Sequence, residues 1–202
     1  TVMLIDLRFD SQESALSPAG RVLMRCHCLA VLGLLRGDDR HEMCSTILSL
    51  GYYHPDLDLA KGVVEGELSH DGRLLLSAIR ESGLLPLGSG EALYWLVAER
   101  LHGIVRGMIS PYQGVKEIRN KLFFPFHKKE QSGQYFGSCL GLASLLGLAD
   151  SYEDVESYRY GDAIVVERDK IEQEIISVSN LTLRTIDIQL YRSFFSASHP
   201  PR

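Results

Sequence analysis

The chain has 202 residues, of which 45% are hydrophobic and 23% are charged, and its 26 acidic and 21 basic side chains give a formal net charge of −5. This mixture is typical of globular proteins and excludes a disordered chain. No stretch approaches the roughly 18 consecutive apolar residues of a membrane-spanning helix, so we expect no membrane contact. The N-terminal residues lack a secretory signal, and the four cysteines are few and irregularly spaced. We therefore expect a cytoplasmic protein with reduced thiols.

The charge is distributed unevenly along the chain. Residues 1–85 and residues 131–202 each carry a net charge of −4, whereas residues 86–130 carry +3. Binding to nucleic acid requires a dense set of Lys and Arg side chains, so an acidic chain of this kind is a poor candidate for it. The acidic parts favour a protein partner with a basic surface.

Helical periodicity dominates the first half of the chain. Residues 2–9 are aliphatic and partly alternating, which predicts a minor β-strand. Ser17 and Pro18 are typical of a helix start, and apolar residues at helical spacing predict a central helix over 18–35 that Gly37 ends. Further helices are predicted over 38–50, from Asp56, and over 73–82, with residues 52–55 as a linker.

The best candidate boundary is the segment 84–90, which is rich in Pro and Gly. It divides the chain into an N-terminal helical part, residues 1–85, and a C-terminal helical part, residues 86–202, unless the two form one continuous domain. In the second part, helices are predicted over 89–106, 136–148 and 162–179. Another helix is predicted from residue 110 to about Phe123, because residues 110–113 combine a capping box with Pro at the first helical position.

The tail over 181–195 fits either a helix or a strand, and we favour a helix. The predicted fold class is therefore mainly α: an irregular helical bundle with at most a minor N-terminal β-strand.

Cysteine and histidine residues gather near the start of the chain, at Cys26, His27, Cys28, His41 and Cys44. Zinc uses these residue types, but on one helix Cys26 and Cys28 lie about 200° apart and cannot share an ion. We therefore favour buried cysteines and predict no metal and no other cofactor.

Histidine and aspartate residues also occur together further along, at His54, Asp56, Asp58, His70 and Asp71. They are suitable for a metal or an acid–base pair, but helix starts favour Asp in any case, and we favour a cap and solvent exposure. We assign no catalytic residue. A metal- or acid/base-dependent enzyme that uses residues 26–71 stays an alternative.

Basic and aromatic residues are interleaved between residues 116 and 129. They are Lys116, Arg119, Lys121, Lys128 and Lys129, with Phe123, Phe124 and Phe126. Such a pattern can bind single-stranded nucleic acid through charge and stacking. It is also typical of an amphipathic helix with phenylalanines in the core and lysines that reach water. A regulator that contacts nucleic acid through residues 116–129 is the second alternative.

The densest acidic run is the segment 150–156. It is compatible with a solvated helix start that Ser151 caps. Acidic residues interleaved with tyrosines also form a recognition surface, because tyrosine is enriched in protein interfaces. The predicted partner-binding residues are Asp150, Tyr152, Glu153, Asp154 and Glu156.

Four short motifs lie between residues 91 and 179: Ala-Leu-Tyr-Trp at 92–95, Ile-Ser-Pro-Tyr-Gln-Gly at 109–114, Gly-Leu-Ala-Ser at 141–144 and Tyr-Glu-Asp at 152–154. In these motifs the chain resembles a group of small, uncharacterised bacterial helical proteins, from which it departs by the insert 145–151. Proteins similar to this group look like partners of toxins. The resemblance therefore implies an immunity role, and it supplies no catalytic residue.

These observations together favour a non-catalytic, intracellular protein that binds a protein partner, with an immunity protein that blocks a toxin as the specific form of this hypothesis. The oligomeric state stays open.

Overall fold

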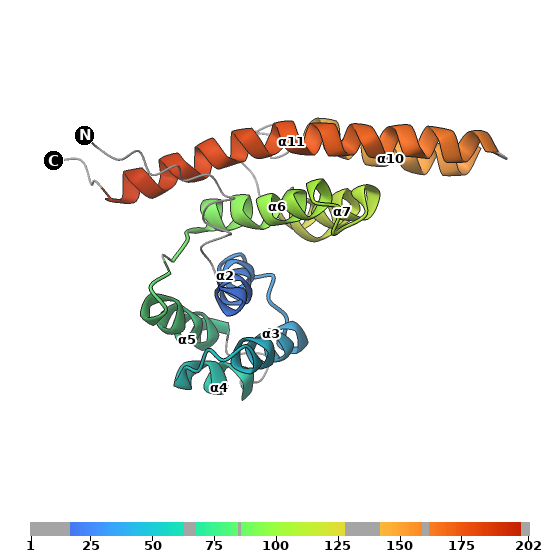
Figure 1. The fold of residues 1–202 in the computed structure, drawn as a ribbon. Helices are drawn as coiled ribbons and strands as arrows, with labels where there is room; N and C mark the ends of the chain where they lie inside the picture. Colours follow the sequence, from blue (N-terminus) through green and yellow to red (C-terminus); the bar gives the residue numbers. More distant parts are fainter. Residues whose placement is uncertain (1–16, 63–67, 85, 128–141, 159–161, 199–202) are drawn as a thin grey trace. The chain divides into compact units, whose positions relative to one another are not determined.

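The computed structural model describes residues 17–62, 68–84, 86–127, 142–158 and 162–198 (Figure 1). These residues form helices and connecting loops and contain no β-strand, which confirms the predicted mainly α fold. The strand predicted over residues 2–9 lies outside the described residues. The chain divides into two compact units, Thr1–Trp95 and Leu96–Arg202. This division falls within a helix that starts at Ser89, inside the predicted boundary segment 84–90.

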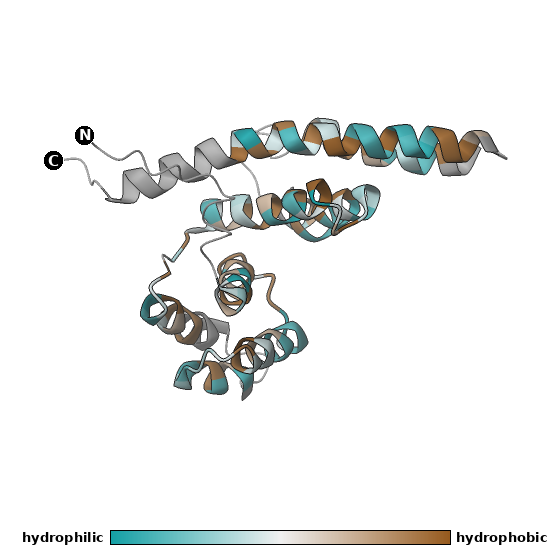
Figure 2. Cartoon of the chain, in the orientation of Figure 1, coloured by the Kyte–Doolittle hydropathy of each residue, from teal (hydrophilic) through white to brown (hydrophobic). Residues whose placement is uncertain are grey.

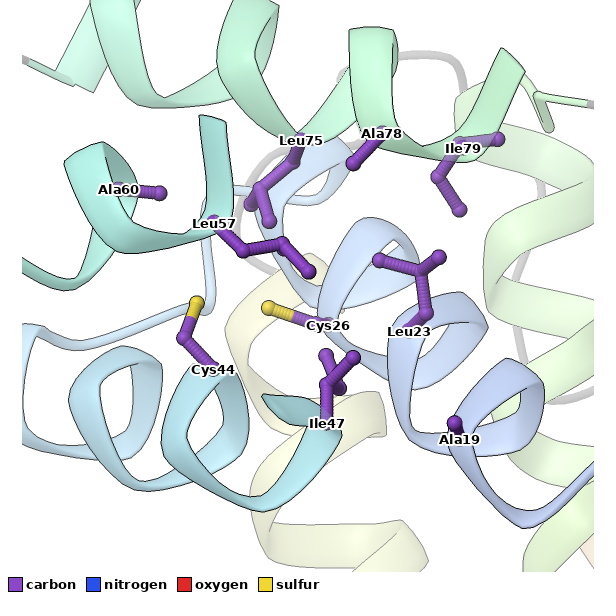
Figure 3. Close-up of a cluster of buried hydrophobic side chains, with 10 residues drawn as sticks. All are labelled: Ala19, Leu23, Cys26, Cys44, Ile47, Leu57, Ala60, Leu75, Ala78 and Ile79. Carbon is purple, nitrogen blue, oxygen red and sulfur yellow. The ribbon is translucent and has the colours of Figure 1, made fainter. Parts of the chain in front are cut away.

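The first unit contains four helices: α2 (Pro18–Val31), α3 (Gly37–Ser49), α4 (Pro55–Gly62) and α5 (Leu68–Glu81). Helix α2 packs against α3 and α5, and α4 packs against the same two helices. All four helices contribute to one buried core (Figure 3). Its residues are Ala19, Leu23, Cys26, Cys44, Ile47, Leu57, Ala60, Leu75, Ala78 and Ile79. Small side chains alternate with large aliphatic ones in this set, which lets the short helices approach closely.

The ends of α2 and α3 show why the chain turns where it does. Gly33 and Gly51 have positive φ angles of 67° and 87°, which glycine adopts at no steric cost. After each one, a backbone N–H donates to the carbonyl five residues earlier, from Leu34 to Leu29 and from Tyr52 to Ile47. These are the hydrogen bonds of the Schellman motif. The prediction for α3 is confirmed, but α2 ends at Val31 rather than near Leu35, because Gly33 and not Gly37 stops it.

His27 fixes the segment that follows α5. Its imidazole is buried on α2, and Nε2 lies 3.0 Å from the Leu87 nitrogen and 3.2 Å from the Leu87 oxygen. One tautomer accepts from the N–H and the other donates to the carbonyl. Burial lowers the pKa of His27, and the hydrogen bond with Leu87 only partly opposes this effect. The folded unit therefore holds His27 neutral.

This environment predicts a pH dependence of stability. The pKa of His27 is lower in the folded state than in the unfolded state, so the unfolded chain binds more protons as the pH falls below about 6.5. The Tm of the wild type should therefore decrease by about 2 °C or more between pH 7.5 and pH 5.5. His27→Gln should be less stable at pH 7.5 and should lose part of this dependence. Parallel Tm–pH curves for the two proteins would argue against a buried neutral His27.

The second unit is built on the last part of α6 (Ser89–Val105), which contributes residues to both units. It continues with α7 (Pro111–Glu117), the π-helix η1 (Ile118–Phe123) and α8 (Phe124–His127). Two long helices complete it, α10 (Ala143–Tyr158) and α11 (Asp162–Ser198). Helix α10 packs along α11, and α7 contacts both of them. Apolar and polar residues alternate along α11 (Figure 2), and its buried stripe includes Ile171, Ile175 and Ile186.

Three local predictions in this unit require correction. The helix predicted over 136–148 does not end at Leu148, since α10 continues through the acidic run to Tyr158. Ser151 is not a cap: it lies inside α10 and its hydroxyl donates to the Gly147 carbonyl at 3.0 Å. Ser110 precedes α7 but makes no side-chain capping hydrogen bond. The tail predicted as a helix is helical, and it joins the helix predicted over 162–179 in the single helix α11.

Helices α6 and α7 approach each other through glycine. A Cβ atom added to Gly114 would lie 2.5 Å from Cγ1 of Ile104, whose side chain is buried. This distance is far below ordinary van der Waals contact, so a larger residue at position 114 requires the core to move. Gly147, which is also within a helix, has no atom near the position of an added Cβ.

The two glycines provide a matched pair of substitutions. Gly114→Ala should lower the free energy of unfolding by about 1–3 kcal/mol, because the clash with Ile104 outweighs the better helix propensity of alanine. Gly147→Ala should instead raise it by about 0.5–1 kcal/mol, because alanine loses less backbone entropy than glycine and meets no obstacle. Urea unfolding of both variants measures the difference. Equal effects of the two substitutions would contradict the close approach.

Candidate functional site

The predicted partner-binding residues lie on one helix, α10, within the second unit. This helix carries four acidic residues and no basic one in its sequence, ASLLGLADSYEDVESY. Asp150 and Asp154 are exposed, whereas Tyr152 and Glu153 are half-buried. Glu156 lies in the last turns of α10, and its side chain is outside the described part. The structure therefore separates the predicted residues: Asp154 is exposed to solvent, Tyr152 and Glu153 pack on neighbouring helices, and Asp150 is exposed but pairs with a basic residue of η1.

These contacts are organised around Arg119 of η1, whose side chain is only 13% exposed. The two terminal nitrogens of its guanidinium bind different carboxylates of α10. Nη1 donates to Oδ1 of Asp150 at 2.8 Å, and Nη2 donates to Oε1 of Glu153. The same Glu153 oxygen accepts the hydroxyl of Tyr112 from α7 at 2.9 Å. Charge-assisted hydrogen bonds of this kind are stronger than neutral ones and fix the geometry of both partners.

Tyr152 completes the connection between α7 and α10. Its ring stacks on the ring of Tyr112 with a centroid distance of 4.1 Å and an interplanar angle of 11°. A cation approaches each ring: Lys116 lies 5.3 Å from the centroid of Tyr112, and Arg168 of α11 lies 5.1 Å from that of Tyr152. Such cation–π contacts add to the stacking. We call Tyr112, Arg119, Asp150, Tyr152 and Glu153 the Arg119 cluster.

The electrostatics of the cluster follow from these contacts. The hydrogen bond from Arg119, with a smaller effect of the Tyr112 hydroxyl, lowers the pKa of Glu153. The hydrogen bond to Glu153 in turn raises the pKa of Arg119 against the opposing effect of burial. Glu153 is therefore a carboxylate at neutral pH whose charge is already compensated within the protein. It contributes to the connection between helices more than to the charge of the surface.

Asp150 and Asp154 differ from Glu153 in their exposure. The Asp150 side chain is 68% exposed although Oδ1 accepts from Arg119. Asp154 is exposed and forms no ion pair with any described residue. These two carboxylates follow each other by one helical turn, so they lie on the same side of α10. They are the predicted residues best placed to meet a partner.

Two basic residues of the proposed nucleic-acid contact, residues 116–129, form ion pairs within the protein. Arg119 belongs to the Arg119 cluster, and Lys121 lies 3.6 Å from Glu117 one turn earlier. Phe123 is buried and Phe124 is half exposed. Residues 128 and 129 lie outside the described segments. Among the basic residues that the structure describes here, Arg119 and Lys121 have acidic partners, and Lys116 lies over the ring of Tyr112.

The cysteine- and histidine-rich region of the first alternative lies in the first unit. Within the described residues, no three side chains of His, Cys, Asp or Glu come together as a metal site requires. His54 is buried: its Nδ1 accepts from the Asp56 N–H at 3.2 Å, and its Nε2 lies 2.9 Å from Oε2 of Glu81. Asp58 is exposed on α4, and the side chains of His70 and Asp71 are outside the described part. This arrangement holds the start of α4 against the end of α5.

None of the described helices is long and apolar enough to cross a membrane. Comparisons of the chain with models of protein families, with curated proteins and with solved structures found no match. The function must therefore be argued from the residues themselves.

The state of Glu153 predicts how acid affects the second unit. Its pKa is lower in the folded state, so its contribution to stability is present above the unfolded value near 4.5 and is lost as the pH falls through the folded value. The Tm should decrease between pH 6 and pH 3, and Glu153→Gln should reduce this decrease. The control is Asp154→Asn, which removes an exposed carboxylate one residue away. An acid transition that is the same in all three proteins would contradict the assignment.

Proposed function

We propose that this chain is a non-catalytic cytoplasmic protein that binds a basic protein partner through α10, and that it is of the immunity type, which binds and blocks a toxin. The observation that carries this proposal is the pair of exposed carboxylates Asp150 and Asp154 on a helix without basic residues. A uniform negative charge on one helix attracts a basic surface and increases the rate of encounter.

The packing of α10 supports the same proposal. A binding surface that is already ordered loses less entropy on association than a mobile one. The Arg119 cluster holds α10 to α7 and η1 through two ion pairs, one hydroxyl hydrogen bond and one ring stack. The exposed carboxylates therefore belong to a helix whose position is fixed by its inner side.

Glu153 and Tyr152 have a different role in this proposal from that of the exposed acids. Both make their main contacts inside the second unit, so they position α10 and do not meet the partner through free polar groups. The contact residues in the proposal are Asp150 and Asp154. Glu156 follows Asp154 by two residues, so it lies on another side of the helix. No observation favours the enzyme or the nucleic-acid alternative over this one.

The test uses the products of the reading frames that flank the gene. Each is expressed alone and together with the chain. A toxin partner should arrest growth alone, and co-expression with the chain should restore growth. The association rate of the purified pair should fall as salt increases, because exposed charges are screened beyond about 8 Å at physiological ionic strength.

Two charge reversals locate the binding surface. Asp154→Lys should reduce the association rate by about tenfold or more and abolish the growth rescue, with little change in Tm. Glu42→Lys is the matched control, because Glu42 is an exposed acid of α3 and the change in net charge is identical. Failure of every flanking product to bind, or equal binding by both variants, would overturn the proposal.

A further inference from the structure

Two cysteines of the first unit face each other in the core. Cys26 comes from α2 and Cys44 from α3, and neither is exposed to solvent. Figure 3 shows their sulfur atoms close together between the two helices. The two thiols share a hydrogen bond.

The surroundings of this pair slow its reaction with oxidants. The hydrogen bond to Cys44 and burial raise the pKa of Cys26 well above its ordinary value, and the positive charge of Arg40 opposes them only in part. A protonated thiol is a poor nucleophile, so the pair reacts slowly while the unit is closed. Reaction requires a transient opening of α2 from α3, or an oxidant small enough to enter the core.

We propose that Cys26 and Cys44 form a redox-sensitive pair, which a peroxide converts into a disulfide that ties α2 to α3. The proposal rests on the facing geometry of two thiols on adjacent helices joined by a short loop. A disulfide needs the sulfurs at about 2.05 Å, so the two helices move toward each other from the hydrogen-bonded contact when it forms. This inference does not depend on the function proposed for α10.

The reaction balances in two steps. The thiolate of one cysteine attacks hydrogen peroxide, the O–O bond breaks, and the sulfur becomes a sulfenic acid while water forms. The thiol of the other cysteine then attacks this sulfur, the S–O bond breaks, and a second water leaves with the thiol proton. Two thiols are thereby oxidised to one disulfide, and one peroxide is reduced to two waters.

The location of Cys28 determines the design of the test. Trypsin releases Cys26 and Cys28 in one peptide, residues 26–36, and Cys44 in another, residues 41–61. The full chain with Cys28→Ala and Cys139→Ala therefore retains only the proposed pair and gives an unambiguous assignment. The wild-type chain is treated in parallel, because Cys28 is itself buried and its replacement affects stability.

Treatment with hydrogen peroxide should remove two hydrogen atoms from the intact mass and join peptides 26–36 and 41–61 in the double variant. The Tm should increase by about 5 °C, because the crosslink restricts the unfolded chain, and a thiol reductant should reverse both changes. Low, non-denaturing urea should accelerate the reaction, since it favours opening of the unit. Addition of Cys44→Ala should abolish the crosslink and the increase in Tm.

Three results would overturn the proposal. They are sulfinic or sulfonic acid at Cys26 or Cys44 without a crosslink, a crosslink in the wild type that joins other cysteines, and two free thiols that persist in peroxide and urea together. A disulfide that lowers the Tm would also do so, because the two helices would then have to be forced together.

Discussion

The guanidinium of Arg119 is the interaction on which the second unit most depends. It is mostly withdrawn from water, and a buried cation is tolerated only when carboxylates compensate it. Asp150 and Glu153 provide that compensation and come from the same face of α10. The cost of leaving Arg119 unpaired therefore fixes the rotation of α10 about its axis, and this rotation decides which acids turn to the outside.

Most of the fold could be predicted from the sequence, because it depends on local signals. Ser17 and Pro18 start α2, and the Ser17 hydroxyl accepts from the Gly20 N–H as a cap does. Gly51 ends α3 with the expected backbone conformation. The errors arose where two local signals compete. Gly33 and Gly37 can both stop a helix, and Ser151 fits both a cap and a hydroxyl that bonds back to a carbonyl within a helix.

The candidate site was less predictable, because its contacts join residues far apart in the sequence. Asp150 and Glu153 stood out as acids, but nothing local indicates that Arg119 compensates them. The role of Tyr112 was equally hidden, since its position in α7 suggested only an ordinary helix start. One signal was present: Tyr112, Lys116 and Arg119 recur at helical spacing and form a polar stripe. Such a stripe is equally typical of a helix face that is exposed to water, so it did not identify the acidic neighbour.

The π-helix η1 has a consequence for how this chain tolerates insertions and deletions. Its wider turns place the Phe124 N–H on the carbonyl of Arg119, five residues earlier. A π-helix segment thus holds one residue more than an α-helix of the same path. Loss of one residue between Arg119 and Phe124 would restore α-helical winding, and the residues on either side would keep their orientation. Arg119 would then keep its carboxylates, so this segment can lose one residue without a change in the phase between the charged and the apolar parts of the helix.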